Sequence, residues 1–498
     1  MQQEILEAGN NAMLVELSES VSAEELAACA DSVRRLAGVE SCTVGHSSLY
    51  VVLEEAGGAP SAGAIGRAVE GASRSSLRPG RAEHLFHVSV HSDVAPDFAL
   101  LEEASGMSRA ALVETLRTLR LTVRYPGFRP GFAYLEGLPA EWSLPRRERP
   151  RPRVDPGSFG IAGSMCAFYP SQSPGGWNIV GRTDAALWDP TRNPPNLLLA
   201  GDRVRLDPVD HVISPQSIPD PAVIPKGEPV AGFEAPGQMT VIASKRNPAR
   251  LGFGLPPSGP FDEAASASAN LAVGNGPDAA VVECAMVGPV LRFTARSLLS
   301  WSGAAVKPLV NGRSIDDPSR IEVTEGDVLE IGRISGGLRG CLAMRGGVED
   351  LNPLTAIGPA RVRAGDALRR LRNEGVKGEV QFERSDRLRI RMRRGPHRAA
   401  HRLFADLVRQ TWRVTGNLDR VCIRLGCTAP TADIPADLPS AGMQFGTVQL
   451  HPGGDLVVMG PDHPVTGGYL QVMTVLVEER WKLAQLTPGD EVTWVDDE

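Results

Sequence analysis

The amino-acid sequence predicts a mainly β protein, with tandem β-barrel-like domains preceded by a small α+β domain. Long helical patterns are few, whereas short alternating segments are many and are separated by glycine and proline along most of the chain. A Gly-Asp step followed by alternating apolar residues also recurs, at Gly201, Gly326, Gly365 and Gly489. Closing each sheet into a barrel would leave no exposed sheet edge.

The Gly-Asp steps have a regular spacing. Gly201 and Gly326 are 125 residues apart, and Gly365 and Gly489 are 124 residues apart. One Gly-Asp turn before a strand is common in β proteins, so a single copy indicates little. Copies at nearly equal, long spacing instead suggest a repeated module of that length.

The first 84 residues mix strand and helix patterns. NAMLVELS and LYVVLEE alternate, whereas SAEELAACADSVRRLAG has a helical period and starts with a Ser22/Glu25 capping box. Residues 1–84 are therefore predicted to form the α+β domain. The segment AEHLFHVSVHSD is then typical of a strand and SRAALVETLRTL of a helix, and they introduce a predicted barrel over residues 85–209.

A proline-rich segment over residues 210–236 has no periodicity, which predicts a stiff, extended linker between two modules. Beyond it, we expect a second module with two halves, residues 237–345 and 346–498. The whole chain has 498 residues, which favours several domains over one core.

Composition narrows the classes of partner. The net charge of −7 provides no basic field, so we expect neither nucleic acid nor a membrane surface as a partner. The N-terminus carries acids where a signal peptide needs a basic start, and no run of about 18 apolar residues occurs, so a cytoplasmic location is expected. Seven scattered cysteines without a C-x-x-C pair favour reduced thiols over disulfides or zinc.

The densest glycine and proline signal lies in GFRPGFAYLEGLP (127–139) and SFGIAGSMCAFYPSQSPGGWNIVGRT (158–183). Such loops let the backbone approach a ligand closely. One interpretation is a substrate site with an aromatic floor and anion-binding donors; the other is a set of barrel-corner turns with core aromatics. The residues concerned are Arg129, Tyr134, Tyr169, Trp177 and Arg182.

The second module offers acidic candidates. In PPSGPFD, Ser258 and Asp262 lie where a loop enters a helical stretch, so Asp262 either holds an amide nitrogen of a substrate or caps the helix. Glu283 lies in the apolar strand AVVECAMV, where an unpaired carboxylate would be costly to bury. It is either a catalytic acid or base, or half of a buried ion pair with an arginine.

In GPDHPVTGGY, His463 is a candidate proton shuttle, with Asp462, Thr466 and Tyr469 beside it as substrate-binding residues; the alternative is an idle, solvent-exposed histidine. Asp419 and Arg420 complete the predicted substrate-binding set.

No metal site is predicted. A histidine pair at helical spacing has no third ligand in view, and a histidine group in a strand pattern would not face one ion. These are His397 with His401, and His84 with His87 and His91.

Several motifs carry a family resemblance. GFRPGFAYL, IAG, YP, SPGGWNIVGRT and AGDRVRL occur in an order that resembles the B-type subunit of 5-oxoprolinase, the kinase-A-inhibitor-like or "allophanate hydrolase subunit 1" family. Four later segments resemble the C-type subunit: residues 254–275, 280–293, 338–348 and 445–492. The same two parts form the carboxyltransferase domain of urea amidolyase. The chain thus resembles a fusion of both parts.

The resemblance implies cyclophilin-like barrels, one in the first module and two in the second. It also implies a component of an ATP-dependent amide-ring hydrolase that opens 5-oxoproline to glutamate, with the TIM-barrel-like A-type subunit of 5-oxoprolinase as partner. ATP is the implied cofactor, a small molecule the implied substrate, and a homo-oligomer is compatible with the family. Biotin-dependent carboxyl transfer ranks lower, because we find no biotin-carrier Met-Lys-Met segment in this sequence.

Departures from the family pattern favour two alternatives. Apolar residues replace usual polar ones at Leu116, Met165, Cys166, Ile242 and Val465. The scaffold is then either repurposed, with these side chains lining one enlarged apolar pocket for a less polar molecule of specialised metabolism, or it is a non-catalytic, kinase-inhibitor-like regulator.

Overall fold

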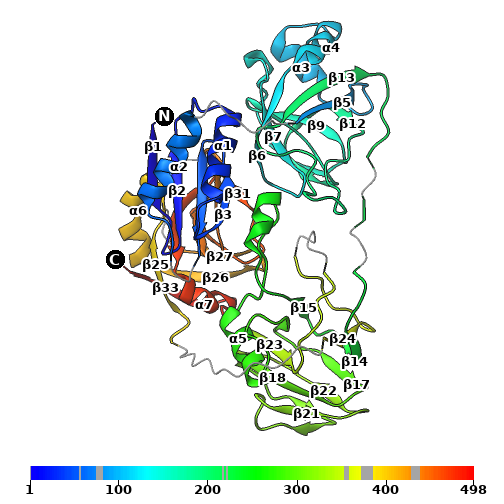
Figure 1. The fold of residues 1–498 in the computed structure, drawn as a ribbon, viewed down its shortest axis with the longest axis vertical. Coiled ribbons are helices and arrows are strands. Elements are labelled where there is room, and N and C mark those ends of the chain that lie inside the picture. Colours follow the sequence, from blue (N-terminus) through cyan, green and yellow to red (C-terminus); the bar gives the residue numbers. More distant parts are fainter. Residues whose placement is uncertain are drawn as a thin grey trace.

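The computed structural model describes residues 2–54, 58–74, 82–215, 218–219, 223–352, 358–371, 385–427 and 438–497. It contains an α+β domain, two closed barrels and a two-sheet sandwich (Figure 1). The fold is mainly β, as the sequence predicts. No described helix has both the length and the apolar character needed to span a membrane.

The N-terminal domain has a four-stranded antiparallel sheet in the order β1-β2-β4-β3 with two helices. The predicted capping box is confirmed, because Ser22 Oγ accepts from the Glu25 N–H at 3.2 Å and the Glu25 carboxylate accepts from the Ser22 N–H at 3.1 Å. The elements are β1 (Gln3–Glu7), β2 (Ala12–Leu17), α1 (Ala23–Arg34), β3 (Val39–Val44), β4 (Ser48–Leu53) and α2 (Ala62–Arg74).

The first barrel closes in the order β10-β7-β6-β13-β5-β12-β9. Its first and last strands, β5 and β13, are parallel, and the other pairs are antiparallel. Its elements are β5 (Glu83–Ser89), α3 (Phe98–Ser105), α4 (Arg109–Thr118), β6 (Leu121–Pro126), β7 (Ala133–Glu136), η1 (Ala140–Trp142), β8 (Arg151–Val154), β9 (Ser158–Ala162), β10 (Met165–Phe168), β11 (Ser173–Gly175), β12 (Asn178–Thr183) and β13 (Arg203–Val209).

The second barrel closes in the order β25-β32-β29-β30-β27-β26-β33, again with its first and last strands parallel. Its elements are β25 (Arg389–Arg394), α6 (Arg398–Arg409), β26 (Thr411–Leu418), β27 (Cys422–Gly426), β28 (Ala441–Gly442), β29 (Thr447–Leu450), β30 (Leu456–Met459), β31 (Thr466–Gly467), β32 (Leu470–Val475), η3 (Val477–Glu479), α7 (Arg480–Ala484) and β33 (Glu491–Asp496).

The sandwich differs from the expected third closed barrel. Its strands form two sheets, ordered β20-β19-β22-β17-β14-β24 and β15-β16-β23-β18-β21, whose inner faces share one core. Its strand elements are β14 (Glu228–Ala235), β15 (Met239–Ala243), β16 (Val281–Ala285), β17 (Val290–Phe293), β18 (Ser297–Ala305), β19 (Leu309–Val310), β20 (Arg313–Ser314), β21 (Ile321–Val323), β22 (Val328–Glu330), β23 (Ser335–Met344) and β24 (Ala367–Arg370).

Strand β14 lies inside the segment 210–236 that the sequence predicts as a linker. It pairs with β17 and β24, so the sandwich starts earlier in the chain than the predicted half-module. Between β15 and β16 the chain forms η2 (Pro248–Phe253) and α5 (Glu263–Ala272). Helix η2 lies beside β3 of the N-terminal domain, whereas α5 packs on β18 and β23 of the sandwich and also contacts α7 of the second barrel (Figure 1).

The Gly-Asp steps form one kind of turn. Each glycine has a left-handed φ between 86° and 92°, a conformation that costs other residues strain. Each aspartate accepts from the backbone N–H three residues earlier, at 2.9, 2.7, 2.8 and 2.7 Å in chain order. The turns precede β13, β22, β24 and β33, so they launch the last strand of each barrel and two strands of the sandwich.

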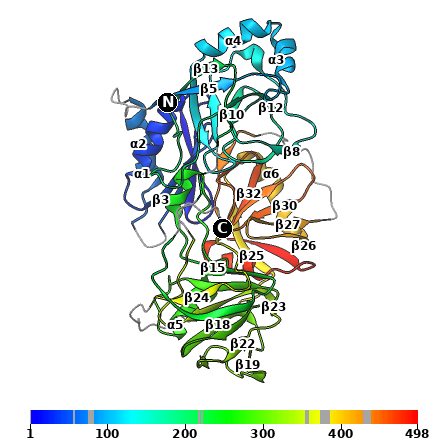
Figure 2. The ribbon, with the colours of Figure 1, turned by 90° about the vertical axis from the view of Figure 1, so that its right-hand side faces the viewer.

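The N-terminal domain packs against both barrels. Arg124 of the first barrel donates from Nε to the His46 carbonyl at 2.6 Å and from Nη1 to the Val21 carbonyl at 2.6 Å. In the second barrel, Gln444 Nε2 donates to the Ala8 carbonyl at 3.2 Å. Figure 2 shows the domain beside both barrels, so loops far apart in the sequence meet between them.

Candidate functional site

The two barrels place the family motifs at equivalent loops. The turn between β6 and β7 corresponds to that between β26 and β27, and the loop from β10 to β12 corresponds to that from β30 to β32. A short side ribbon marks both longer loops, β11 with β8 and β31 with β28. Gly-Gly-Trp ending at Trp177 and Gly-Gly-Tyr ending at Tyr469 precede the equivalent strands β12 and β32.

Arg420 is the centre of the charged candidate site. The Asp419 carboxylate accepts from the Val421 and Cys422 N–H groups at 2.7 and 3.0 Å, which fixes the tight turn that carries Arg420. Arg420 Nε donates to Asp462 Oδ2 at 2.7 Å, and Nη1 donates to Glu283 Oε1 at 2.5 Å. One guanidinium thus joins the second barrel to strand β16 of the sandwich.

Backbone and hydroxyl groups complete the network. Arg420 Nη2 donates to the Gly259 carbonyl at 2.5 Å, and Ser258 Oγ donates to Asp462 Oδ1 at 2.7 Å. The other oxygen of Glu283 accepts from the Phe261 N–H at 2.5 Å. Glu283 is 3% exposed. The buried ion pair with an arginine, one of the two interpretations of Glu283, is therefore present in the structure.

The electrostatics follow from this burial. Burial by itself lowers the pKa of Arg420, but the carboxylates of Glu283 and Asp462 outweigh it, and the net pKa is raised. Nearby Arg339 is also buried, and burial lowers its pKa to about 10 although Glu283 acts against the shift. Arg339 lies over the Phe261 ring at 4.3 Å and donates to the Ala484 carbonyl at 3.0 Å.

A cavity of about 200 Å³ opens beside the network, between the sandwich and the second barrel. Its charged lining comprises three carboxylates and three guanidiniums, and apolar side chains of β15 and β16 form much of the rest. A smaller cavity of about 40 Å³ shares Pro359 with it and is lined by Ser258 and Gly259. The charged residues of the larger cavity are Glu283, Asp419, Asp462, Arg339, Arg361 and Arg420.

Asp262 caps a helix. Its Oδ1 accepts from the Ala265 N–H at 2.8 Å at the start of α5, which is the capping alternative in the sequence analysis. Its Oδ2 accepts from Gln485 Nε2 at 2.6 Å, and the residue is completely buried. Both oxygens therefore bind protein groups and join the sandwich to the second barrel.

His463 is buried, so the solvent-exposed alternative is wrong. Only 1% of the residue is exposed, and burial lowers its pKa to about 4. Nδ1 lies 2.8 Å from the Pro464 carbonyl, which requires the proton on Nδ1 and leaves Nε2 as the lone-pair nitrogen. The ring hydrogen bond of His463 thus stays within its own loop, apart from the Arg420 network.

The aromatic residues of the first barrel form a second cluster. Phe132 contacts Tyr134, Tyr169 and Trp177 edge-on, with ring centroids 5.0, 5.5 and 5.9 Å apart. Tyr134 also stacks on Tyr125 at 4.5 Å. Tyr169 is 1% and Trp177 7% exposed, so these rings pack as a core at the loop end of the barrel. That arrangement matches the barrel-corner interpretation.

The aromatic cluster touches the second barrel. A Cβ on Gly127 would lie 2.5 Å from Thr466 Oγ1 and 3.2 Å from Tyr134, so only glycine fits there. Thr466 therefore borders the aromatic cluster and not the Arg420 network. Tyr469 stacks on His451 with ring centroids 4.0 Å apart.

The remaining two predicted residues lie apart from the network. Arg129 lies with its guanidinium 5.7 Å from the Phe128 ring centroid. Arg182 pairs with Asp155 at 3.3 Å and donates to Ser214. The structure thus brings together Ser258, Glu283, Asp419, Arg420 and Asp462. Asp262 lies at the start of α5, and the other predicted residues are distributed over the first barrel and the loop from β30 to β32.

The expected apolar pocket is not formed. Leu116 and Cys166 are buried inside the first barrel, whereas Ile242 packs on the sandwich core. Met165 lies against the aromatic cluster and the N-terminal core, and Val465 is buried in the loop from β30 to β32. Met165 and Cys166 face different cores because neighbouring strand residues face opposite sides of a sheet, and the other three side chains lie on different elements of the fold.

Sequence patterns did not identify two further residues of the charged cavity. Arg339 is the one arginine of strand β23, SGGLRGCLAM, and a lone charge within an apolar strand is the same kind of signal that identified Glu283. Arg361 forms an isolated bridge with Val241 and gives no comparable pattern.

Within the described ranges, no three His, Cys, Asp or Glu side chains form a group that could hold a metal ion. His397 Nδ1 accepts from the Gln471 N–H at 3.1 Å, and His401 Nε2 lies 3.2 Å from the Gly395 carbonyl. Cys42 and Cys284 are buried thiols outside any disulfide, and burial raises the pKa of Cys42 to about 11 and that of Cys284 to about 12.

Comparison with known proteins agrees with this architecture. Residues 3–198 match a family model described as carboxyltransferase domain, subdomain C and D, and residues 253–496 match its counterpart for subdomain A and B. The chain belongs to this carboxyltransferase-domain family. Its C and D part precedes its A and B part, and the Arg420 network lies wholly within the A and B part.

Curated relatives and a solved structure extend the match. The chain is 42% identical over 113 residues to the B-type subunit of 5-oxoprolinase from Escherichia coli O157:H7, which covers 23% of this chain and 52% of that protein. It is 24% identical over 256 residues to the C-type subunit of 5-oxoprolinase from Haemophilus influenzae, covering 48% and 82%. The crystal structure of TTHA0988 matches with a TM-score of 0.85 and 28% identity over 97% of this chain and 99% of that one.

The chain spans about half the length of the B-type relative. Its family membership and its two-part, 5-oxoprolinase-like organisation are nevertheless clear, because the two family models together cover most of the sequence.

Proposed function

We propose that this chain is the fused B-type and C-type component of an ATP-dependent enzyme that opens a small amide or lactam such as 5-oxoproline. Relatives named as the B-type and C-type subunits of 5-oxoprolinase both match it, and the two family models fall on its first and second parts. Joining both parts in one chain keeps their ratio at one and raises their effective concentration.

The charged cavity beside Arg420 is the observation that supports this function best. Arg420 is neutralised by Glu283 and Asp462, so a carboxylate on the ligand would be bound by the other two guanidiniums, Arg361 and Arg339. A ring amide would then lie near Asp462, whose carboxylate accepts a hydrogen bond from the Ser258 hydroxyl. Asp462 is the proposed proton acceptor of the site.

The cavity does not match ATP. Its volume is about 200 Å³ and its carboxylates are as numerous as its guanidiniums, whereas a triphosphate needs an excess of positive charge. We therefore derive no step through ATP from these residues. We propose that ATP is turned over on a TIM-barrel-like, A-type partner.

The test is release of glutamate from 5-oxoproline, measured with and without ATP and with and without a homologue of the A-type partner. We expect glutamate only when all components are present. Exposed Arg361 is the informative variant: Arg361→Gln should raise KM for 5-oxoproline about tenfold with a smaller change in kcat, because it removes a ligand contact. Arg292→Gln, which removes an exposed arginine of β17, is the matched control. Absence of turnover with a folded protein and an active partner would refute the proposal.

Carboxyl transfer is the second candidate, favoured by the family description of both matching models. The test supplies a separate carboxybiotin carrier with a labelled carboxyl group and measures transfer of the label to urea or another small amide. Transfer without glutamate release would favour carboxyl transfer over opening of an amide ring.

A further inference from the structure

The sandwich carries a second, unassigned cleft at the far end of β23 from Arg339. Its volume is about 380 Å³, and it lies where the ends of β18, β21, β23 and β24 meet. Arg339 and Arg345 are six residues apart along this strand, which corresponds to about 20 Å. The cleft is lined by Arg296, Ser297, Leu298, Arg320, Glu322, Arg345 and Arg370.

The lining has an excess of positive charge. Four arginines face one glutamate, on a protein whose net charge is −7. Glu322 forms ion pairs with two of these arginines, at 2.8 Å from Arg320 and 3.6 Å from Arg296. Protein surfaces usually intersperse charges of both signs, so guanidiniums held together in a concave site indicate an anionic ligand.

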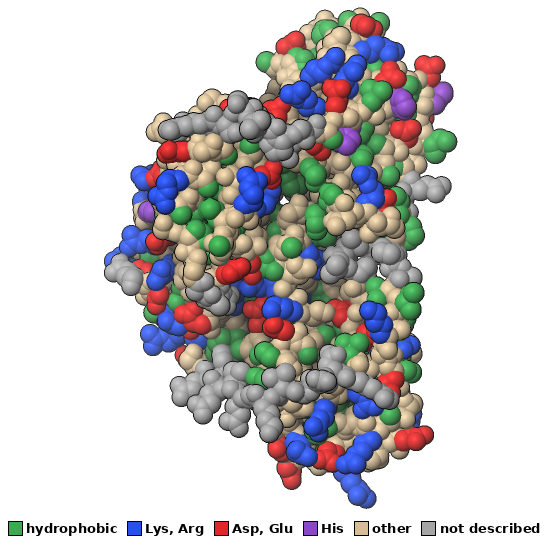
Figure 3. Space-filling view, viewed as in Figure 1, with side chains coloured by type: hydrophobic (Ala, Val, Ile, Leu, Met, Phe, Trp, Pro, Cys, Tyr) green, Lys and Arg blue, Asp and Glu red, His purple; other side chains and the backbone are tan. Residues whose placement is uncertain are grey.

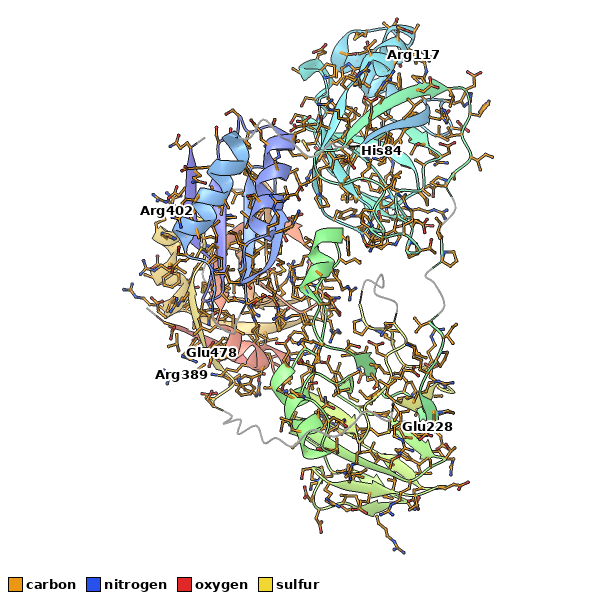
Figure 4. The ribbon with its side chains drawn as sticks, in the orientation of Figure 1. His84, Arg117, Glu228, Arg389, Arg402 and Glu478 are labelled. Atoms are coloured by element: carbon orange, nitrogen blue, oxygen red, sulfur yellow. The ribbon has the colours of Figure 1, made fainter. Side chains whose placement is uncertain are left out.

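One of these arginines is fixed in place. Arg370 binds Glu228, the residue labelled on β14 in Figure 4, and its Nη1 donates to the Arg296 carbonyl at 3.0 Å. Counting Glu228 as well, the cleft still has four guanidiniums for two carboxylates. The end of the molecule formed by the sandwich shows several basic side chains among a few acidic ones (Figure 3).

Arg345 supplies unused hydrogen-bond donors. Its backbone N–H donates to the Leu298 carbonyl at 2.9 Å, which holds the residue at the end of β23. Among the described residues, its guanidinium has no hydrogen-bond or ion-pair partner, although it lines the cleft. A guanidinium presents five donors in a planar fork that matches phosphate oxygens in pairs.

We propose that this arginine cleft binds a small anion with two or more phosphate groups, that is, a diphosphate or triphosphate, either free or as part of a nucleotide. Several guanidiniums distributed around one concave site suit several phosphate groups better than a single carboxylate. The cleft is separate from the charged cavity beside Arg420, so the proposal does not depend on the amide substrate.

Titration calorimetry of the full-length chain at low salt tests this inference, with inorganic pyrophosphate, ATP and inorganic phosphate as separate titrants. We expect pyrophosphate to bind with a Kd below about 1 mM and more tightly than phosphate. Its affinity should fall as salt is added. Pyrophosphate and ATP of equal affinity would show that the phosphate chain is the ligand; a large preference for ATP would point to a nucleotide.

The informative variant is Arg345→Gln, which removes no ion pair among the described residues. We expect this variant to bind pyrophosphate and ATP at least about tenfold more weakly than the unaltered chain. Arg313→Gln is the matched control, because it removes the same charge from exposed strand β20 of the sandwich outside the cleft, and its effect should stay within about twofold. Failure of both pyrophosphate and ATP to bind at millimolar concentration, or equal weakening by the two variants, would overturn the inference.

Discussion

The two closed barrels share one strand order but differ in the chemistry of their loop ends. In the first barrel, the loops after β6 and β10 bring Phe132, Tyr169 and Trp177 into an aromatic core. In the second, the equivalent loops after β26 and β30 bring Arg420 and Asp462 into a charged network with the sandwich. The scaffold thus determines where the loops meet, and the side chains decide whether that place is an apolar core or an ionic one.

This difference determines how mutations at the loop end of each barrel affect stability. An aromatic core loses packing when a ring is truncated, and its loss is nearly independent of pH. An ionic network loses charge balance when one partner is removed, and its loss depends on the protonation of the carboxylates that remain. Four predictions test this contrast, from the largest expected effect to the smallest.

Removing the Arg420 guanidinium should have the largest effect. Arg420→Ala leaves Glu283 and Asp462 buried without their counter-charge, and we expect a loss of about 3 to 5 kcal/mol in unfolding free energy at neutral pH. Urea denaturation followed by tryptophan fluorescence measures it. The loss should shrink below about pH 5, where the orphaned carboxylates take up protons. A loss that is the same at both pH values would contradict an ionic origin.

Truncating the central aromatic ring of the first barrel should lower the unfolding free energy slightly less than Arg420→Ala does. Phe132→Ala removes contacts with four aromatic rings, and we expect a loss of about 3 kcal/mol in unfolding free energy that does not change between neutral and acidic pH. Phe132→Leu, which keeps most of the volume, is the control and should lose about half as much. A strong pH dependence here would remove the distinction between the two barrel ends.

Acid should weaken the second barrel through two of its histidines, the buried His463 and the half-buried His397. The pKa values of His463 and His397 are both lowered to about 4 by burial, whereas an unfolded histidine titrates near about 6.5. Between these values the unfolded chain binds more protons. Stability is therefore complete above about pH 6.5, and each histidine should lower the unfolding free energy by about 1 kcal/mol as the pH falls from about 6.5 to about 5.5.

The His463→Gln variant checks that pH dependence. Its urea midpoint should be less sensitive to pH between 6.5 and 4 than that of the unaltered chain, because one of the two titrations is gone. Replacement of exposed His87, which lies in the first barrel, is the control for removing a histidine elsewhere in the chain. Equal slopes in the unaltered chain and the His463→Gln variant would show that His463 does not titrate in this range.

The smallest expected effect concerns the turns that the barrels share. Gly201→Ala and Gly489→Ala place a side chain at φ values of 86° and 92°, and each should cost about 1 kcal/mol or slightly more. Because both turns share the hydrogen bond from the backbone N–H three residues before the aspartate, the two losses should agree, which thermal melting can measure. A clear difference would show that the barrels are less alike than their topology.

By itself, the sequence determined the features that depend on neighbouring residues. The Ser22/Glu25 capping box and the Gly-Asp turns appear as predicted because their hydrogen bonds join residues three positions apart. The mainly β class appears as predicted because it follows from an alternating pattern. The requirement of Glu283 for a partner was also readable from its apolar surroundings.

Only the tertiary structure decided which residues meet. Arg420 is 137 residues from Glu283, and Ser258 is 204 residues from Asp462, so no local pattern could identify these pairs. The same holds for the sandwich, since whether a sheet closes depends on distant strand pairing such as that of β14 with β24. A charged residue in an apolar strand indicates from the sequence alone that it needs a counter-charge. Which residue supplies that counter-charge depends on how the second barrel packs against the sandwich.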